Sequence, residues 1–224
     1  LVLLLPPGAL FFRETLDTLV EQRQLLGPGE LWSSLIGFVI LAFGATGFLI
    51  QRDFRQTLKR LGLEPMRIQH LGIALFGIVG LFAVNSFAEW LQQTYFPRWY
   101  EADQHGNEMI AGQLTGGQAL LLGLSAGIGE EISMRGALQP KLGLVLTSLL
   151  FAGLHIQYSW FGVGVIAMLG FTLGWIRRRT NTSVAIFVHA AYVAIAVLSL
   201  ESGGCAARSL SSPIRPAGAE LPRC

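Results

Sequence analysis

Charged residues are scarce in this 224-residue chain: they make up 13% of the sequence, and the formal net charge is only +2. Soluble domains contain about a quarter charged residues, so the composition argues against a soluble protein. The small net charge, without a cluster of arginine and aromatic residues, also argues against nucleic-acid binding. Cysteine is scarce as well, and Cys205 and Cys224 both lie in the polar C-terminal stretch, where they cannot cross-link an apolar core.

Long apolar runs, by contrast, are abundant: 52% of the residues are hydrophobic and the mean hydropathy is +0.52. A helix crosses the hydrocarbon core of a bilayer in about 20 residues. Apolar segments of about this length lie at residues 31–50, 70–91, 117–139, 142–158, 160–176 and 182–200. We therefore predict an all-α fold, a polytopic transmembrane helical bundle with about six to seven spans.

Composition divides the chain into three regions. Residues 1–30 begin with an apolar piece that Pro6, Pro7 and Gly8 interrupt, and we interpret them as a truncated N-terminal apolar piece followed by an amphipathic surface helix. Residues 31–200 form the predicted membrane-embedded domain. Residues 201–224 are rich in Gly, Ser, Pro and Arg, and we expect them to be a disordered polar tail.

Basic residues alternate from loop to loop. Lys and Arg fill the loop at 51–69, occur again at Lys141 and recur at 177–179, whereas the loop at 92–116 contains only Arg98. With alternating spans, the three basic loops lie on one side of the membrane, which the positive-inside rule assigns to the cytoplasm. Four of the five tryptophans also fall at predicted span ends, where indole rings prefer the headgroup region: Trp32, Trp90, Trp160 and Trp175.

Three charges interrupt the apolar, glycine-rich stretch that follows residue 116: Glu130, Glu131 and Arg135. A carboxylate at the centre of a spanning helix costs a few kcal/mol or more, so it normally faces the protein interior or a wet cavity and marks a functional site. Single histidines, His155 and His189, occur in later apolar segments. One histidine in an apolar helix is more often a satisfied core residue, but two of them after an acidic cluster favour a hydrolytic site inside the membrane.

Spacing gives the two glutamates different predicted roles. Glu131 and Arg135 are four residues apart, so on a helix they can form an ion pair. Glu130 lies about 100° further round the helix axis and stays free to act as a general base or acid. A purely stabilising ion-pair knot between helices is the alternative interpretation. Phe151 and His155 are also four residues apart, so their rings can pack together.

These residues form three motifs in a fixed order: Glu130-Glu131-x-x-x-Arg135, Phe151-x-x-x-His155 and His189 in a later span. The set, within a motif core at residues 117–200, resembles the CPBP family of intramembrane proteases, also called the Abi or CAAX-protease family. The resemblance implies an intramembrane endopeptidase in which Glu130, His155 and His189 are catalytic and Glu131, Arg135 and Phe151 support them.

The resemblance also implies the setting of the protein. The family includes prenyl-protein endoproteases that remove three C-terminal residues after CAAX prenylation, and bacterial members tied to bacteriocin processing or immunity. We therefore expect an integral membrane protein of the bacterial plasma membrane. Its expected partner is a protein or peptide substrate, with or without a prenyl group, and no nucleic acid.

One position departs from the family pattern. The family usually has Asn or Asp four residues after the final histidine, where it is thought to help hold the tetrahedral oxyanion, and this chain has Val193 there. The loss of one such donor costs about 3 kcal/mol of transition-state stabilisation. Either another group, such as Tyr192 or Asn85, substitutes for it or the activity is reduced, and the sequence leaves both alternatives open.

Two mechanisms use the same three residues. Glu130, His155 and His189 are ligand types of catalytic zinc, although the His-Glu-x-x-His pattern of many zinc proteases is absent. In a glutamate mechanism no cofactor is needed: Glu130 deprotonates a water, His155 polarises the nucleophile and His189 steadies the oxyanion.

Two rival functions also remain open. The string Gly123-Leu-Ser125-Ala-Gly127 matches G-x-S-x-G and suggests a rhomboid-like serine protease, but that motif requires a strand-to-helix elbow, and small residues here fit close helix packing. The second rival is a non-catalytic membrane scaffold or bacteriocin-immunity protein, which Val193 favours.

Overall fold

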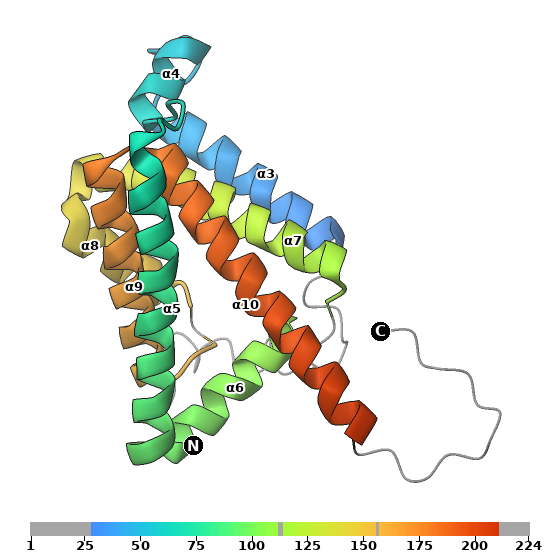
Figure 1. The fold of residues 1–224 in the computed structure, drawn as a ribbon. Coiled ribbons are helices and arrows are strands. Elements are labelled where there is room, and N and C mark those ends of the chain that lie inside the picture. Colours follow the sequence, from blue (N-terminus) through green and yellow to red (C-terminus); the bar gives the residue numbers. More distant parts are fainter. Residues whose placement is uncertain (1–27, 112–113, 156, 211–224) are drawn as a thin grey trace, which may run out of the picture.

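Helices account for most of the residues that the computed structural model describes, namely 28–111, 114–155 and 157–210 (Figure 1). In chain order the elements are α3 (Pro28–Ala45), α4 (Phe54–Leu61), α5 (Gln69–Tyr95), α6 (Pro97–Ala111), α7 (Gly116–Ser125), the π-helices η2 (Ala126–Glu130) and η3 (Ile132–Leu138), α8 (Gln139–Gly153), α9 (Trp160–Arg179) and α10 (Thr182–Leu210). These described residues form no β-sheet, which confirms the predicted all-α class.

Five helical stretches in the described part of the chain are long and apolar enough to cross a membrane: Pro28–Ala45, Gln69–Tyr95, Gly116–Gly153, Trp160–Arg179 and Thr182–Ser199. The chain is therefore a polytopic integral membrane protein. The sequence predicted six spans here, because it separated residues 117–139 from 142–158. In the structure these two segments form one helical stretch.

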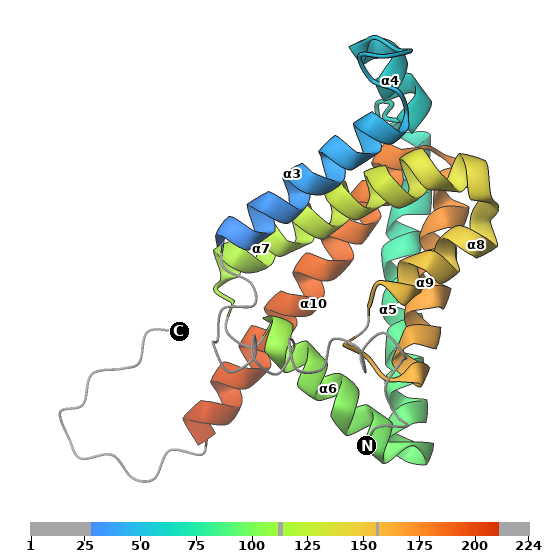
Figure 2. The ribbon, with the colours of Figure 1, turned by 180° about the vertical axis from the view of Figure 1, so that it is seen from behind.

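The stretch Gly116–Gly153 reverses its direction at Gly143. The backbone of Gly143, with φ 79° and ψ 174°, is not helical, and glycine adopts such a positive φ without steric cost. Figure 2 shows the chain running along α7, turning, and returning through α8 beside α9. The two predicted spans are thus the two arms of a helical hairpin.

Close backbone packing joins this hairpin to α10. A Cβ atom at Gly127 of η2 would lie 2.6 Å from the Cβ of Ala190, and one at Gly123 would lie 2.7 Å from the carbonyl oxygen of Ala190. Only hydrogen fits at these two positions, so the helices touch backbone to backbone. This contact confirms that the small residues of the G-x-S-x-G string serve helix packing.

Two of the basic loops meet at one end of the bundle, where α4 packs against η3 and the hydroxyl of Thr182, at the start of α10, donates to the carbonyl oxygen of Leu61 (Figure 1). The guanidinium of Arg60 donates to the carbonyl oxygen of Gly136 at 3.3 Å. The backbone N–H of Thr182, just after the arginines that end α9, donates to the carbonyl oxygen of Gly62 at 2.9 Å. The loops at 51–69 and 177–179 therefore lie at the same end of the bundle, in agreement with the prediction that the basic loops share one side of the membrane.

The last helix is longer than the predicted membrane domain. α10 continues to Leu210, so the first residues of the segment predicted to be a disordered tail are helical. Extending an existing helix by a residue is far easier than nucleating a new one, which explains the overrun. Residues 211–224 lie outside the described residues, as do residues 1–27, which hold the predicted apolar piece and most of the predicted amphipathic helix.

Candidate active site

The acidic motif lies on π-helical backbone. Glu130 is the last residue of η2, Glu131 joins it to η3, and Arg135 lies within η3. A π-helix is rare; it occurs mostly as a short segment within an α-helix, and frequently at a functional site. Residues four apart still lie on one side of such a helix, so the predicted relation between Glu131 and Arg135 survives the change of helix type.

Glu131 is the centre of a buried polar cluster. Its side chain is fully buried; its Oε2 lies 3.3 Å from Nε of Arg135, and its Oε1 lies 3.0 Å from Nδ1 of His189. The first contact confirms the predicted ion pair. The second brings in a residue of α10 that the sequence had assigned to Glu130. We name Glu131, Arg135 and His189 the Glu131 cluster.

The contact with Glu131 fixes the orientation of the His189 ring. When Nδ1–H donates to the carboxylate, Nε2 is the ring nitrogen left to act on another group. This arrangement, a carboxylate holding one nitrogen of a histidine, is how many enzymes set the tautomer and direction of a catalytic imidazole. His189 is itself buried, with 7% of its surface exposed.

Arg135 links the cluster to α8 and α9. Its Nη2 donates to the carbonyl oxygen of Gly170 at 3.2 Å, and its guanidinium carbon lies 4.6 Å from the centre of the Phe151 ring. A Cβ at Gly170 would lie 2.9 Å from Cδ1 of Phe151, so glycine makes room for both contacts. With 1% exposure, Arg135 is held entirely by protein groups, yet its Nη1 has no hydrogen-bond partner among the described residues.

Phe151 lies between the two histidines. Its ring centre is 4.9 Å from that of His155 and 6.0 Å from that of His189. The first distance confirms the predicted packing of Phe151 against His155. Nδ1 of His155 is also 3.0 Å from the carbonyl oxygen of Phe151, which orients the half-buried imidazole. Both histidines and the Glu131 cluster are thus connected through one aromatic ring.

Glu130 stands apart from these contacts. It is half-buried, and it has no hydrogen bond or ion pair with any described residue. Within the described part of the chain, no three side chains of His, Cys, Asp or Glu lie close enough together to hold a metal ion. Glu130, His155 and His189 as arranged therefore do not fit a zinc site.

Gln139 is a polar residue of this region that sequence reasoning missed. It lies one turn after Arg135, is 3% exposed, and its Nε2 donates to the carbonyl oxygen of Gly174 at 2.9 Å. Arg135 and Gln139 therefore bind two carbonyls four residues apart on α9. The signal was present in the sequence, since the spacing of Gly170 and Gly174 matches the spacing of Arg135 and Gln139.

Ser125, the residue of the serine-protease alternative, is buried and bonded elsewhere. Its hydroxyl donates to the carbonyl oxygen of Leu31 in α3 at 3.0 Å, and 4% of its surface is exposed. The backbone around it is helical, with α7 passing into η2, rather than the strand-to-helix elbow on which a G-x-S-x-G nucleophile sits. Its hydroxyl makes no hydrogen bond to His155 or His189.

Val193 packs in an apolar environment, against a buried cluster that includes Ala119 and Val197. The two residues considered as substitutes for the missing amide are engaged with α5. The amide of Asn85 donates to Oε1 of Glu89 at 2.9 Å, and the ring of Tyr192 packs 4.9 Å from that of Phe82.

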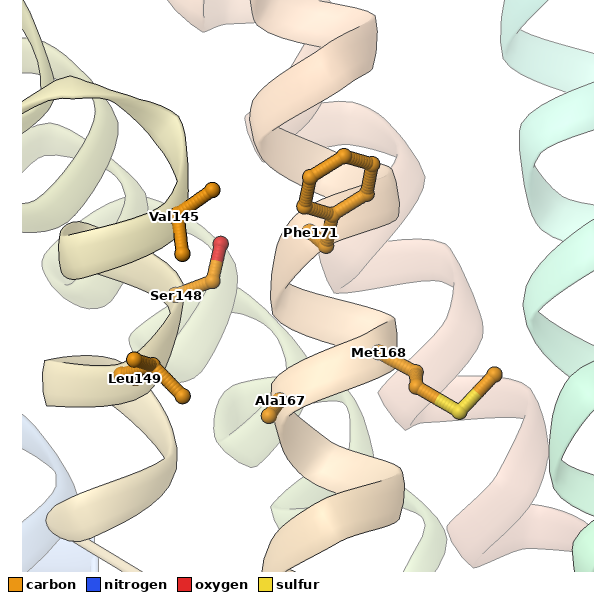
Figure 3. A pocket seen from close by; sticks show the side chains of 6 residues that line it. All are labelled: Val145, Ser148, Leu149, Ala167, Met168 and Phe171. Atoms are coloured by element: carbon orange, nitrogen blue, oxygen red, sulfur yellow. The ribbon is translucent and has the colours of Figure 1, made fainter.

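A shallow apolar pocket of about 220 Å³ lies between α8 and α9 (Figure 3). Its lining residues are Val145, Ser148, Leu149, Ala167, Met168 and Phe171. It contains no titratable group, and the hydroxyl of Ser148 is used by its own helix, where it donates to the carbonyl oxygen of Leu144. The charged and titratable groups described above therefore do not line this pocket.

Comparison with known proteins adds an independent observation. Residues 113–195 match the family model described as type II CAAX prenyl endopeptidase Rce1-like. The chain is 30% identical over 154 residues to the uncharacterized protein YpbD of Bacillus subtilis, an alignment that covers 67% of this chain and 78% of that protein. No solved structure matches the chain.

Proposed function

The chain belongs to the Rce1-like CAAX prenyl endopeptidase family, and we propose that it is an intramembrane endopeptidase in which Glu130 activates the attacking water. The observation that carries this proposal is the unequal use of two adjacent carboxylates. Glu131 is fully buried and occupied by Arg135 and His189, whereas Glu130 is half-buried and has no partner among the described residues. A carboxylate without a protein partner is the one that can accept a proton from water.

In the proposed reaction, Glu130 takes a proton from a water molecule while the water oxygen attacks the carbonyl carbon of the scissile peptide bond. The same proton then passes to the leaving amine, so that Glu130 returns to its ionised form. His155 orients the water. His189, in its imidazolium form, keeps Nδ1–H on Glu131 and donates Nε2–H to the oxyanion. Glu131 and Arg135 act by holding the ring of His189.

We propose that the substrate is a peptide bond in a membrane-associated protein. Substrates with and without a prenyl group are compared in the test. We also propose that the basic loops are cytoplasmic and that the membrane is the bacterial plasma membrane. The loop asymmetry supports the orientation, because the cations of the 51–69 and 177–179 loops gather at one end of the bundle. Labelling of single cysteines at Lys59 and Arg178 from the cytoplasmic side tests it; labelling of the two from opposite sides would refute it.

The test of the reaction is cleavage of a peptide library, with farnesylated and unmodified members, by the full chain in proteoliposomes. Glu130→Gln keeps the shape of the side chain and removes the base, so we expect the rate to fall roughly 10²- to 10⁴-fold. Ser125→Ala is the control for the serine mechanism, and we expect it to cleave at the wild-type rate. A wild-type rate in Glu130→Gln together with an inactive Ser125→Ala would overturn the proposal.

Val193 gives the proposal a second test. If the missing amide limits the reaction, Val193→Asn should raise the cleavage rate, because an amide one turn after His189 would add a donor for the oxyanion. Val193→Leu, which keeps the position apolar, is the matched control and should not raise it. Equal rates in the two variants would show that position 193 takes no part in oxyanion binding.

A non-catalytic scaffold is the second candidate function, and one observation favours it. The carboxylate of Glu131 and the guanidinium of Arg135 are both buried and lie within ion-pair distance of each other, as a purely structural ion-pair knot would require. If neither the wild type nor Val193→Asn cleaves any member of the library, while Glu130→Gln folds like the wild type, the scaffold is the better account.

A further inference from the structure

Helix α6 carries a second polar network, at the end of the bundle away from α4 (Figure 1). Its centre is Asp103, which is 7% exposed. The carboxylate accepts three hydrogen bonds: from Nε2 of Gln92 on α5 at 2.6 Å, and from the backbone N–H and the hydroxyl of Ser159 at 2.5 and 2.8 Å. A buried carboxylate that accepts this many bonds from two other segments fixes their relative positions.

Ser159 links Asp103 to the start of α9. The Ser159 hydroxyl also accepts a hydrogen bond from the backbone N–H of Gly162 at 3.1 Å, which makes it the N-cap of that helix. A Cβ at Gly162 would lie 2.6 Å from Oδ2 of Asp103, so the contact requires glycine. The carboxylate therefore sits directly against the first turn of α9.

A second contact from α6 reaches the residue that touches His155. The hydroxyl of Tyr158 donates to Oδ1 of Asn107 at 2.6 Å, and the Tyr158 ring lies 6.4 Å from the His155 ring, within the range of aromatic contact. The backbone N–H of Tyr158 also donates to the carbonyl oxygen of His155 at 3.3 Å. His155 is thus held from one side by Phe151 and from the other by Tyr158.

The Tyr158 hydroxyl remains a donor throughout the range in which an enzyme would be assayed. Burial, and secondly the nearby negative charge of Asp103, raise the pKa of Tyr158 to about 12. The bond to Asn107 therefore does not switch off near neutral pH. The network is a fixed support rather than a pH-dependent one.

From these contacts we infer that Asp103 and Asn107 of α6 are positioning residues for His155, acting through Ser159 and Tyr158. The inference rests on the proposed role of His155 in catalysis. Asp103 and Asn107 precede residues 113–195, the region that matches the family model. None of the four residues touches the Glu131 cluster, so their effect on the reaction must pass through the placement of the imidazole.

The first test measures the imidazole directly. The full chain, labelled with ¹³C-histidine and placed in lipid nanodiscs, contains four histidines, and His155→Gln assigns the signal of interest. We expect Tyr158→Phe and Asn107→Ala each to shift the His155 resonance. Tyr100→Phe is the matched control: it removes a tyrosine hydroxyl on α6 that has no hydrogen-bond partner among the described residues. An unchanged His155 signal in both Tyr158→Phe and Asn107→Ala overturns the inference.

The second test uses the peptide cleavage assay. A small misplacement of a catalytic group can cost about 100-fold in rate, so Asp103→Asn should lower kcat by about 10- to 100-fold with KM within about twofold of the wild type. Tyr158→Phe and Asn107→Ala remove the same bond, so the double variant should be no slower than the slower single variant. A raised KM with unchanged kcat, or additive losses, would overturn the positioning role.

The two tests separate this inference from the proposed function. If the wild type cleaves no peptide but the His155 resonance moves with Tyr158 and Asn107, the proposed function fails and the coupling of α6 to His155 stands. If the wild type is active and neither the resonance nor kcat responds, the positioning role fails and the proposed function stands.

Discussion

Removing the Arg135 guanidinium should destabilise the protein by about 3–5 kcal/mol, because it leaves the buried carboxylate of Glu131 without its cation. Opposite unit charges 3.3 Å apart attract by about 5 kcal/mol at an effective dielectric constant of about 20. Contact with the Phe151 ring at 4.6 Å adds about 1–2 kcal/mol when desolvated. His189 still donates to Glu131 in the variant, which keeps the loss below the sum of these terms.

The variants that test this are Arg135→Met and the double variant Arg135→Met/Glu131→Gln. The double variant removes the stranded charge as well as the cation, so we expect it to recover most of the lost stability. Arg178→Met is the matched control, because Arg178 is exposed at the end of α9, and we expect it to stay within about 0.5 kcal/mol of the wild type.

The measurement is equilibrium unfolding in mixed micelles of mild detergent and sodium dodecyl sulfate, followed by tryptophan fluorescence. The reasoning is refuted by an Arg135→Met protein within about 1 kcal/mol of the wild type, or by a double variant no more stable than the single one. Either result would mean that solvent reaches Glu131 or that its carboxylate is protonated in the folded protein.

Three further predictions follow from the packing, the buried tyrosine and the ligand geometry. Gly127→Ala places a methyl group 2.6 Å from the Cβ of Ala190 and should lower the free energy of unfolding by about 1–3 kcal/mol in the same assay. Gly164→Ala is the control, because a Cβ there meets nothing within 4 Å, and it should leave the stability unchanged. Equal effects of the two substitutions would refute the close packing of η2 on α10. Because the pKa of Tyr158 is raised to about 12 in the folded protein, the unfolded chain loses this proton at a lower pH than the folded one. The free energy of unfolding should therefore fall by about 2 kcal/mol as the pH rises from 10 to 12, and it should fall less in Tyr158→Phe. The described residues do not gather three metal ligands, so cleavage should survive incubation with 1,10-phenanthroline, and an inhibition that added Zn²⁺ reverses would assign the reaction to a metal instead.

Contacts within one helix were predictable from the sequence, because helical spacing alone determines them. The pairs Glu131–Arg135 and Phe151–His155 are each four residues apart, and the structure contains both contacts. The connection between the two arms of the hairpin was less predictable, since a hydropathy pattern does not show that two predicted spans belong to one helical stretch that reverses at a glycine with positive φ.

Contacts between distant helices depended on features that the pattern of residue types does not encode. His189 reaches Glu131 because η2 and α10 approach backbone to backbone at Gly127 and Ala190, and Ala190 is the next residue after His189. The sequence suggested close packing there, but it did not give the register that selects Glu131 over Glu130. The π-helical backbone that carries both glutamates had no signal in the sequence either.

The burial of Glu131 and Arg135 is itself an argument about role. A buried ion pair contributes little net stability, because desolvation offsets its attraction, and a well-packed apolar pair often replaces it without loss. Glu131 and Arg135 are also four residues apart on one helical segment, so their ion pair does not itself join two helices. What an apolar pair cannot do is accept a hydrogen bond from Nδ1 of His189 and fix the direction of its other nitrogen. The Glu131 cluster is therefore better explained by the orientation of His189 than by stability. This supports our proposal that Glu130, one residue away and without a partner among the described residues, is the carboxylate that acts on water.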